Sequence, residues 1–290
     1  MMSKHLLTAG AFGLCLVINS AMAAPSPQFN LTKIFKTVTD GAKAAKDISE
    51  SDEIVLGQEV AANLLSLGPL LENQEVQSYV NKVGRWVSLH SERPDLPWTF
   101  VVLDLSDATA FAAPGGYIVI TKGLLLKLNS EAELAGVLGH EASHVVRKHH
   151  LSAIKKANTT AFLKTLGDTA LDASGKDNRR NRAFLEIASL GAALYGVGLD
   201  KDSEFEADRM GVVLATRAGY DSFGLPAVLQ TLQGSKGSEV NSLVSTHPPT
   251  SDRLNQLDRV MGSNFDRFDA LPTVEDRFLK IKELITAKKK

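Results

Sequence analysis

The sequence predicts an α+β fold that is mainly helical, with a small sheet beside one central helix. Apolar residues recur at helical spacing over most of the 290 residues, and only two short segments are rich in aromatic and β-branched residues. Apolar residues make up 44% of the chain and charged residues 22%, as in a globular protein with a full core. The net charge of −1 gives no basic excess, so we do not expect nucleic acid as a partner.

The first residues have the features of a cleaved export signal. Lys4 precedes a short apolar run over 6–18, and the A-M-A sequence at 21–23 suits a cleavage site. The run is too short to span a bilayer comfortably. The alternative to a signal peptide is a buried N-terminal helix. We expect a signal peptide over 1–23 and export, with the periplasm as the favoured compartment. Cys15 is the only cysteine, so the mature chain would have no disulfide.

The mature chain is expected to contain an N-terminal helical segment over 24–52 and a main domain over 53–290. Apolar residues at helical spacing in 31–48 predict a helix that packs on the domain or, alternatively, lies at a surface. Segment 183–199 is strongly apolar but is interrupted by Glu186, glycine and serine, which favours a buried core helix over a membrane span. We therefore expect no transmembrane span in the mature chain.

Periodicity and turn residues predict the elements of the main domain. Strands are expected over 98–105 and 117–121, with a turn at 113–116 before the second strand. The second strand has two interpretations, an exposed edge that pairs with an extended peptide or an interior strand of the sheet. Predicted helices cover 53–71, 76–89, 123–128, 131–155, 203–219 and 273–285, and a further helix begins at Thr250 or Ser251.

The helix over 131–155 has a clear start signal. Ser130 and Glu133 match the S-x-x-E capping box, in which two side chains bind the free N–H groups of the first turn. Apolar residues then follow at helical spacing. Four of the seven histidines of the chain lie in 138–150, so this helix carries most of the imidazole groups.

Two of these histidines form the H-E-x-x-H pattern. His140 and His144 lie one turn apart on one helix face, where both imidazoles can reach one zinc ion at roughly 2 Å. Glu141 follows the first of them and can hold the attacking water and take its proton. This pattern predicts a zinc site that hydrolyses a peptide bond.

The other histidines have simpler interpretations. His149 and His150 end the same stretch beside two cationic residues, and positive charge there suits the helix dipole. We prefer this interpretation to metal binding. His90 matches no motif and is interpreted as a surface residue.

A catalytic zinc ion needs a third protein ligand. The segment DSEFEADRMG at 202–211 offers Glu204, Glu206 and Asp208. On a helix, Glu204 and Asp208 share a face, whereas Glu206 points elsewhere. A carboxylate one turn beyond a ligand can accept a hydrogen bond from the outer nitrogen of a ligating histidine. From these residues alone, a solvated acidic face is an equally good interpretation.

Several spaced motifs resemble one family. They are AFAAPGG at 110–116, EAELAGVLGHEASHVVRKH at 131–149, EFEAD at 204–208 and HPPTSDR at 247–253. In this order they resemble the zinc metallopeptidase family that contains the CAAX prenyl proteases and HtpX. The chain is most similar to the exported bacterial branch, which includes periplasmic beta-barrel assembly-enhancing proteases. That branch continues into a helical repeat domain, which we do not expect here because the sequence ends at Lys290.

The resemblance implies a zincin-like metallopeptidase domain and a role for each matching residue. The E-x-x-A-D pattern of the family implies that Glu204 binds zinc and that Asp208 supports the site. His247 would donate a hydrogen bond to the oxyanion or, alternatively, occupy the fourth zinc position and keep the enzyme latent. Arg253 would anchor the loop of His247.

Together these observations predict a zinc endopeptidase with one Zn²⁺ per chain. His140, His144 and Glu204 would bind the metal, and Glu141 would be the general base. The expected substrates are unfolded or misassembled envelope proteins, with peripheral association to the outer-membrane assembly machinery as a further expectation. The rival interpretation is an envelope assembly factor or chaperone with a structural zinc site, but such a site has no need of Glu141.

Overall fold

The structure is a computed structural model that describes residues 48–153, 198–234, 247, 249–268 and 270–287. The predicted signal peptide, nearly all of the segment over 24–52 and all but the last two residues of the predicted core helix over 183–199 lie outside these residues. All described residues belong to one compact unit, Leu31–Lys290.

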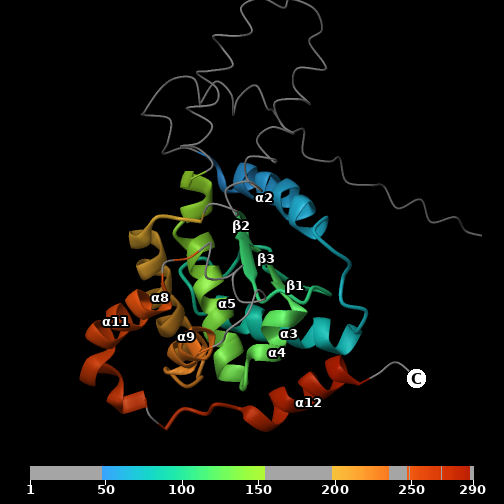
Figure 1. The fold of residues 1–290 in the computed structure, drawn as a ribbon. Coiled ribbons are helices and arrows are strands. Elements are labelled where there is room, and N and C mark those ends of the chain that lie inside the picture. The colour runs from blue at the N-terminus through green and yellow to red at the C-terminus, as the bar shows by residue number, and fades with distance from the viewer. Residues whose placement is uncertain (1–47, 154–197, 235–246, 248, 269, 288–290) are drawn as a thin grey trace, which may run out of the picture. The chain divides into compact units, whose positions relative to one another are not determined.

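The described elements agree in type with the predicted ones (Figure 1). Each predicted helix in this part of the chain is present, with ends that differ by up to six residues except in α5, which ends nine residues before the predicted 155. The α9 helix, the 3-10 helix η4 and the β2 strand were not predicted. The elements are α2 Glu50–Leu65, α3 Gln74–Ser88, β1 Thr99–Leu103, β2 Ala110–Ala113, β3 Tyr117–Thr121, α4 Lys122–Lys127, α5 Glu131–Val146, α8 Lys201–Arg217, α9 Gly224–Gly234, α11 Thr250–Met261, η4 Gly262–Phe268 and α12 Glu275–Thr286.

The strand YIVIT, β3, is the central strand of the sheet. The strand order is β1-β3-β2, with β3 parallel to β1 and antiparallel to β2. The interpretation of β3 as an exposed edge is therefore wrong, and the alternative of an interior strand is confirmed. The reason is that the short AFAA segment forms β2 and pairs with β3 across the tight turn at 114–116.

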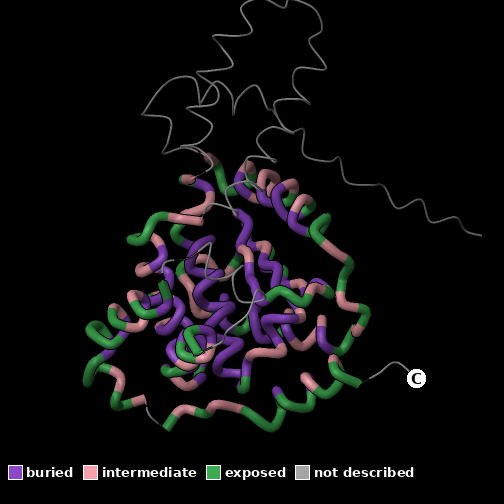
Figure 2. Tube along the Cα trace, in the orientation of Figure 1, coloured by how far each residue is buried: buried purple, intermediate pink, exposed green. Residues whose placement is uncertain are grey.

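The α5 helix is the centre of the fold. Every one of its residues is buried, because α3 and the sheet pack on one part of its surface and α8 and α9 on another. Figure 2 shows this helix within the buried interior, whereas exposed residues lie on the peripheral helices. A helix surrounded in this way has no solvated face, so its polar side chains must find partners inside the protein.

The start of α5 is held by its cap and by a buried carboxylate. The Ser130 hydroxyl accepts from the Glu133 N–H at 3.1 Å, as the capping box predicts. The Glu133 carboxylate instead accepts from the N–H of Asn129 at 2.8 Å. Glu131 is fully buried and accepts hydrogen bonds from partners on three other parts of the fold, Tyr79, Tyr220 and Arg277.

The end of α5 differs from the prediction. The helix expected to continue to 155 ends at Val146, and helical residues resume at 149 and continue to 153, the last described residue of this part of the chain. Lys148, in the turn between them, has a φ of 59°, which is left-handed backbone that breaks a helix. Its ammonium pairs at 3.0 Å with the buried carboxylate of Glu53, which also binds Arg93. The ion pair accompanies the break in the helix after Val146.

The α5 and α8 helices approach each other most closely at two glycines. A Cβ atom built on Gly139 would lie 2.8 Å from the carbonyl oxygen of Gly211, and one built on Gly211 would lie 2.8 Å from the nitrogen of His140. Only a residue without a side chain fits at this crossing. The two glycines therefore set the spacing between the helices that carry the H-E-x-x-H and E-x-x-x-D patterns.

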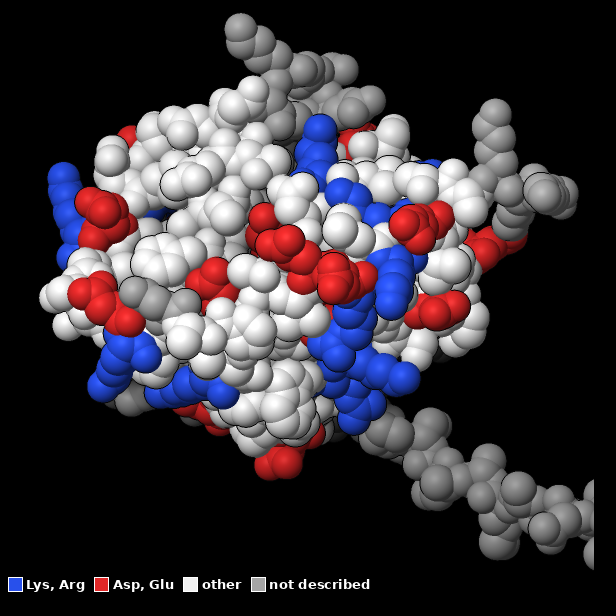
Figure 3. Space-filling model, turned by 90° about the horizontal axis from the view of Figure 1, so that it is seen from below, with Lys and Arg blue, Asp and Glu red and all other residues white. Residues whose placement is uncertain are grey.

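The described surface carries both signs of charge. Figure 3 shows Lys and Arg side chains interspersed with Asp and Glu side chains on the face seen from below. Within the described residues, no helix has the length and apolar character needed to cross a membrane.

Replacing Gly139 by alanine should weaken the fold. In a free helix alanine is more favourable than glycine by about 0.5–1 kcal/mol, but here the added methyl meets the backbone of α8. We expect a loss of about 1–3 kcal/mol in the free energy of unfolding, measured by denaturant titration. Gly234→Ala is the matched control, because a Cβ there meets nothing within 4 Å. Equal stability of the two variants would contradict the proposed close contact.

Candidate metal centre

The two histidines of the H-E-x-x-H pattern face the same point in space. Both lie on α5, their side chains are buried, and their Nε2 atoms are 3.1 Å apart. Their ring centroids are 4.7 Å apart. At this separation both nitrogens are able to reach one ion at zinc–nitrogen distances of roughly 2 Å.

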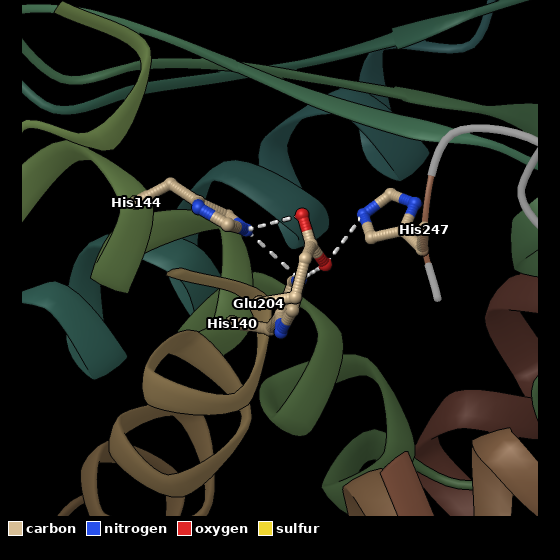
Figure 4. A group of neighbouring side chains, drawn as sticks. All are labelled: His140, His144, Glu204 and His247. Atoms are coloured by element: carbon tan, nitrogen blue, oxygen red, sulfur yellow. Dashed lines mark hydrogen bonds and ion pairs between the residues drawn. The ribbon is translucent and has the colours of Figure 1, made fainter. Parts of the chain in front are cut away.

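Glu204 and His247 complete a cluster around these nitrogens (Figure 4). The Glu204 carboxylate, from the first turn of α8, lies 3.7 Å from each histidine Nε2. His247 comes from the segment before α11, and its Nε2 lies 3.5 Å from the same carboxylate. One ligand atom from each of the four residues falls within 4.8 Å of the others. Residues far apart in the sequence thus meet in a group able to hold one metal ion.

Burial shifts the pKa values of the clustered groups toward their neutral forms. Burial lowers the pKa of His144 well below its ordinary value, which keeps the imidazole neutral and a possible ligand. Burial raises the pKa of Glu204 to about 9, although Arg253 acts in the opposite direction. The Oε2 atom of Glu204 is buried and accepts no hydrogen bond from any described residue. A cation at the centre of the cluster would compensate this carboxylate, so the donor set fits a metal.

His140 is oriented by a carboxylate on α8. Its outer nitrogen, Nδ1, lies 2.9 Å from Oδ1 of Asp208. Arg253, from α11, donates to both oxygens of Asp208, at 2.8 and 2.5 Å. Burial would raise the pKa of Asp208, but the Arg253 guanidinium holds it well below its usual range. The ionised carboxylate therefore accepts the Nδ1–H of His140 and leaves Nε2 free for the centre of the cluster.

Glu141 lines a cavity beside the cluster. The same cavity is lined by His140, His247, Arg253 and apolar residues of α9. Burial raises the pKa of Glu141 to about 8, with Arg253 acting in the opposite direction. Its side chain is therefore next to the ligand group without being one of the four clustered residues.

The structure brings most of the predicted site residues together. His140, His144, Glu204 and His247 form the cluster, and Glu141, Asp208 and Arg253 surround it. Glu206 points away from the cluster, as expected, and pairs with Arg147 at 2.7 Å. Arg253 contacts Asp208 and His140, which is closer to the centre than the loop anchor that the sequence predicted.

The helix-dipole interpretation of His149 and His150 is wrong. Both residues follow the break at Lys148, and their rings lie against His144, with centroids 5.1 and 5.2 Å away. On a continuous helix His149 would lie on a different face from His144. The sequence carried no signal for the left-handed residue that turns the chain, so the contacts of His149 and His150 with His144 were not predicted.

Comparison with known proteins assigns a family. The model described as Peptidase family M48 matches residues 70–261, well over half of the chain. The chain is 26% identical over 219 residues to the beta-barrel assembly-enhancing protease of Escherichia coli strain K12, covering 74% of this chain and 45% of that protein.

Two further relatives match a similar region. The mitochondrial metalloendopeptidase OMA1 of Arabidopsis thaliana is 26% identical over 220 residues, covering 75% of this chain and 43% of that protein. The metalloprotease YcaL of E. coli strain K12 is 26% identical over 225 residues, covering 76% of this chain and 84% of that protein. The chain thus spans less than half the length of the first two relatives.

Glu204→Ala should lose tightly bound metal, because the variant removes the carboxylate of the cluster. Asp202→Ala is the matched control, since Asp202 is an exposed acid in the same turn of α8. We expect stoichiometric zinc in the control and strongly reduced zinc in the Glu204 variant, measured by metal analysis after dialysis. Equal retention would mean that the ligand lies elsewhere.

Arg253→Met should destabilise the protein, because it leaves the buried Asp208 carboxylate without its cation. Removing one partner of a buried pair costs about 3–5 kcal/mol. Denaturant unfolding should show a loss of this size, whereas Arg259→Met, at an exposed site on the same helix, should change stability little. Similar losses in both variants would argue against the buried pair.

Proposed function

The chain belongs to peptidase family M48, and from this premise we propose that it is a zinc-dependent endopeptidase. The single observation that carries the proposal is the buried cluster of His140, His144, Glu204 and His247, with Glu141 lining the adjacent cavity. This arrangement combines a metal-binding group with a carboxylate in reach of a substrate carbonyl. A purely structural metal site has no use for such a carboxylate.

In this proposal each residue has one task. His140, His144 and Glu204 hold the zinc ion, and Asp208, itself held by Arg253, orients His140. When bound, the ion supplies Lewis-acid activation of the attacking water and of the peptide carbonyl. Glu141 takes the proton of that water and delivers it to the leaving amine. Burial raises the pKa of Glu141 to about 8, which favours the protonated form needed in the second step, and a cation bound beside it would favour the ionised form needed in the first.

The proposed substrates are unfolded or misassembled exported proteins of the cell envelope. The signal-like segment over 1–23 supports export to the periplasm, and the name of the beta-barrel assembly-enhancing protease supports a connection with outer-membrane assembly. We propose that the protein associates peripherally with that assembly machinery. Because β3 is the central strand of the sheet, it has no free edge that could pair with an extended substrate.

Glu141→Gln tests the proposed activity. The amide cannot take a proton from water, but the metal ligands are unchanged, so zinc content and thermal stability should match the wild type. Hydrolysis of an unfolded protein substrate should fall to the level of chelator-treated enzyme. Full hydrolysis by this variant with bound zinc would remove Glu141 from the mechanism, and zinc-bound wild type without any hydrolysis would favour the assembly-factor interpretation.

His247→Ala distinguishes two roles for this histidine. We favour a fourth ligand in the resting enzyme, since His247 Nε2 lies 3.5 Å from Glu204 within the cluster. Its removal should then open a metal position and raise peptidase activity. As an oxyanion donor, its loss should lower the turnover rate roughly 10²–10³-fold at unchanged zinc content. Peptidase assays with parallel zinc analysis give opposite results for the two roles, and an unchanged variant would exclude both.

A further inference from the structure

The second ligand histidine has an outer partner that the H-E-x-x-H pattern does not contain. His144 directs Nε2 toward His140 and Glu204, so Nδ1 is its outer nitrogen. That Nδ1 lies 3.0 Å from Nδ1 of His149, which is hydrogen-bond distance. The His149 side chain is 9% exposed, so water does not readily replace this contact.

The tautomers of the two rings follow from this contact. A histidine that offers Nε2 to a metal carries its proton on Nδ1, and a hydrogen bond between two ring nitrogens needs one donor and one acceptor. His144 Nδ1–H is therefore the donor and His149 Nδ1 the acceptor. His149 then carries its own proton on Nε2.

A carboxylate fixes the far side of His149. Its Nε2 lies 3.3 Å from Oε2 of Glu206, and the other oxygen of Glu206 accepts from Arg147 Nε at 2.7 Å. Every donor in this chain of contacts meets an acceptor. This series of hydrogen bonds leads from the metal cluster through His149 to the half-exposed Glu206 and Arg147.

The two ligand histidines are thus supported in parallel ways. His140 donates directly to Asp208, which Arg253 holds. His144 donates to His149, which in turn donates to Glu206, and Arg147 holds Glu206. In both cases the outer nitrogen leads to a carboxylate that is paired with an arginine. The second arrangement is one imidazole longer and reaches closer to solvent.

We propose that His149 is a positioning residue that accepts the Nδ1–H of His144 and so fixes the ring orientation and tautomer that metal binding requires. Such outer partners typically contribute roughly 10–100-fold in metal affinity. The inference rests on the metal site of the proposed function. The contact follows the break at Lys148, whose left-handed backbone ends the α5 helix before His149.

A matched pair of variants tests this role. Asparagine carries an acceptor oxygen near the position of the histidine Nδ1, and leucine has the same shape without an acceptor. We expect His149→Leu to bind zinc roughly 10–100-fold more weakly than the wild type in competition with a chelator, and His149→Asn to recover most of the loss. The cobalt(II) absorption spectrum should change in the leucine variant and return toward the wild type in the asparagine variant. His90→Leu is the control for loss of a distant imidazole.

Equal zinc affinity of the leucine and asparagine variants would overturn the proposal, since only the acceptor distinguishes them. Wild type that binds no zinc would instead overturn the proposed function itself. If the leucine variant does not fold, ¹⁵N NMR of the zinc-bound wild-type protein tests the same hydrogen bond. A scalar coupling between Nδ1 of His144 and Nδ1 of His149, with the proton on His144, supports the proposal, and its absence or the opposite proton position contradicts it.

Discussion

The backbone contact between α5 and α8 at Gly139 and Gly211 is the constraint on which the rest of the site depends. It brings one helix with two imidazoles against another with two carboxylates, at a separation that no larger residue permits. One turn of α8 then places Glu204 at the inner nitrogens and Asp208 at the outer nitrogen of His140. A small shift at this crossing would change both sets of distances together.

Burial determines how the ionisation of Asp208 and Glu204 depends on their partners. Transfer of an ionised group from water into the interior costs several kcal/mol unless a partner compensates it. Asp208 has Arg253 and stays ionised, whereas Glu204 has an oxygen without a hydrogen bond among the described residues. That oxygen lies where the inner nitrogens converge. A bound cation would favour the ionised form of Glu204, so metal binding and folding are expected to stabilise each other.

The sequence predicted the parts of the site that depend on spacing within one helix. His140 and His144, and likewise Glu204 and Asp208, are four residues apart, and helix geometry places such pairs on one face. The capping residue Ser130 similarly marked the start of α5. The order of the strands was not predicted, because β2 consists of four residues, mostly alanine, whose pairing depends on the turn that follows.

The sequence by itself determined most of the described helices, though not α9 or η4, together with the histidine pair and the candidate carboxylates, because these follow from local periodicity. Only the tertiary structure decided that His149 contacts His144, that Arg253 holds Asp208, and that α5 ends at Val146. Arg253 and Asp208 come from segments distant in the chain, and the contact of His149 with His144, five residues earlier, depends on the break in the helix at Lys148. Lys148 illustrates the reason, since its left-handed backbone accompanies an ion pair with Glu53, almost a hundred residues earlier.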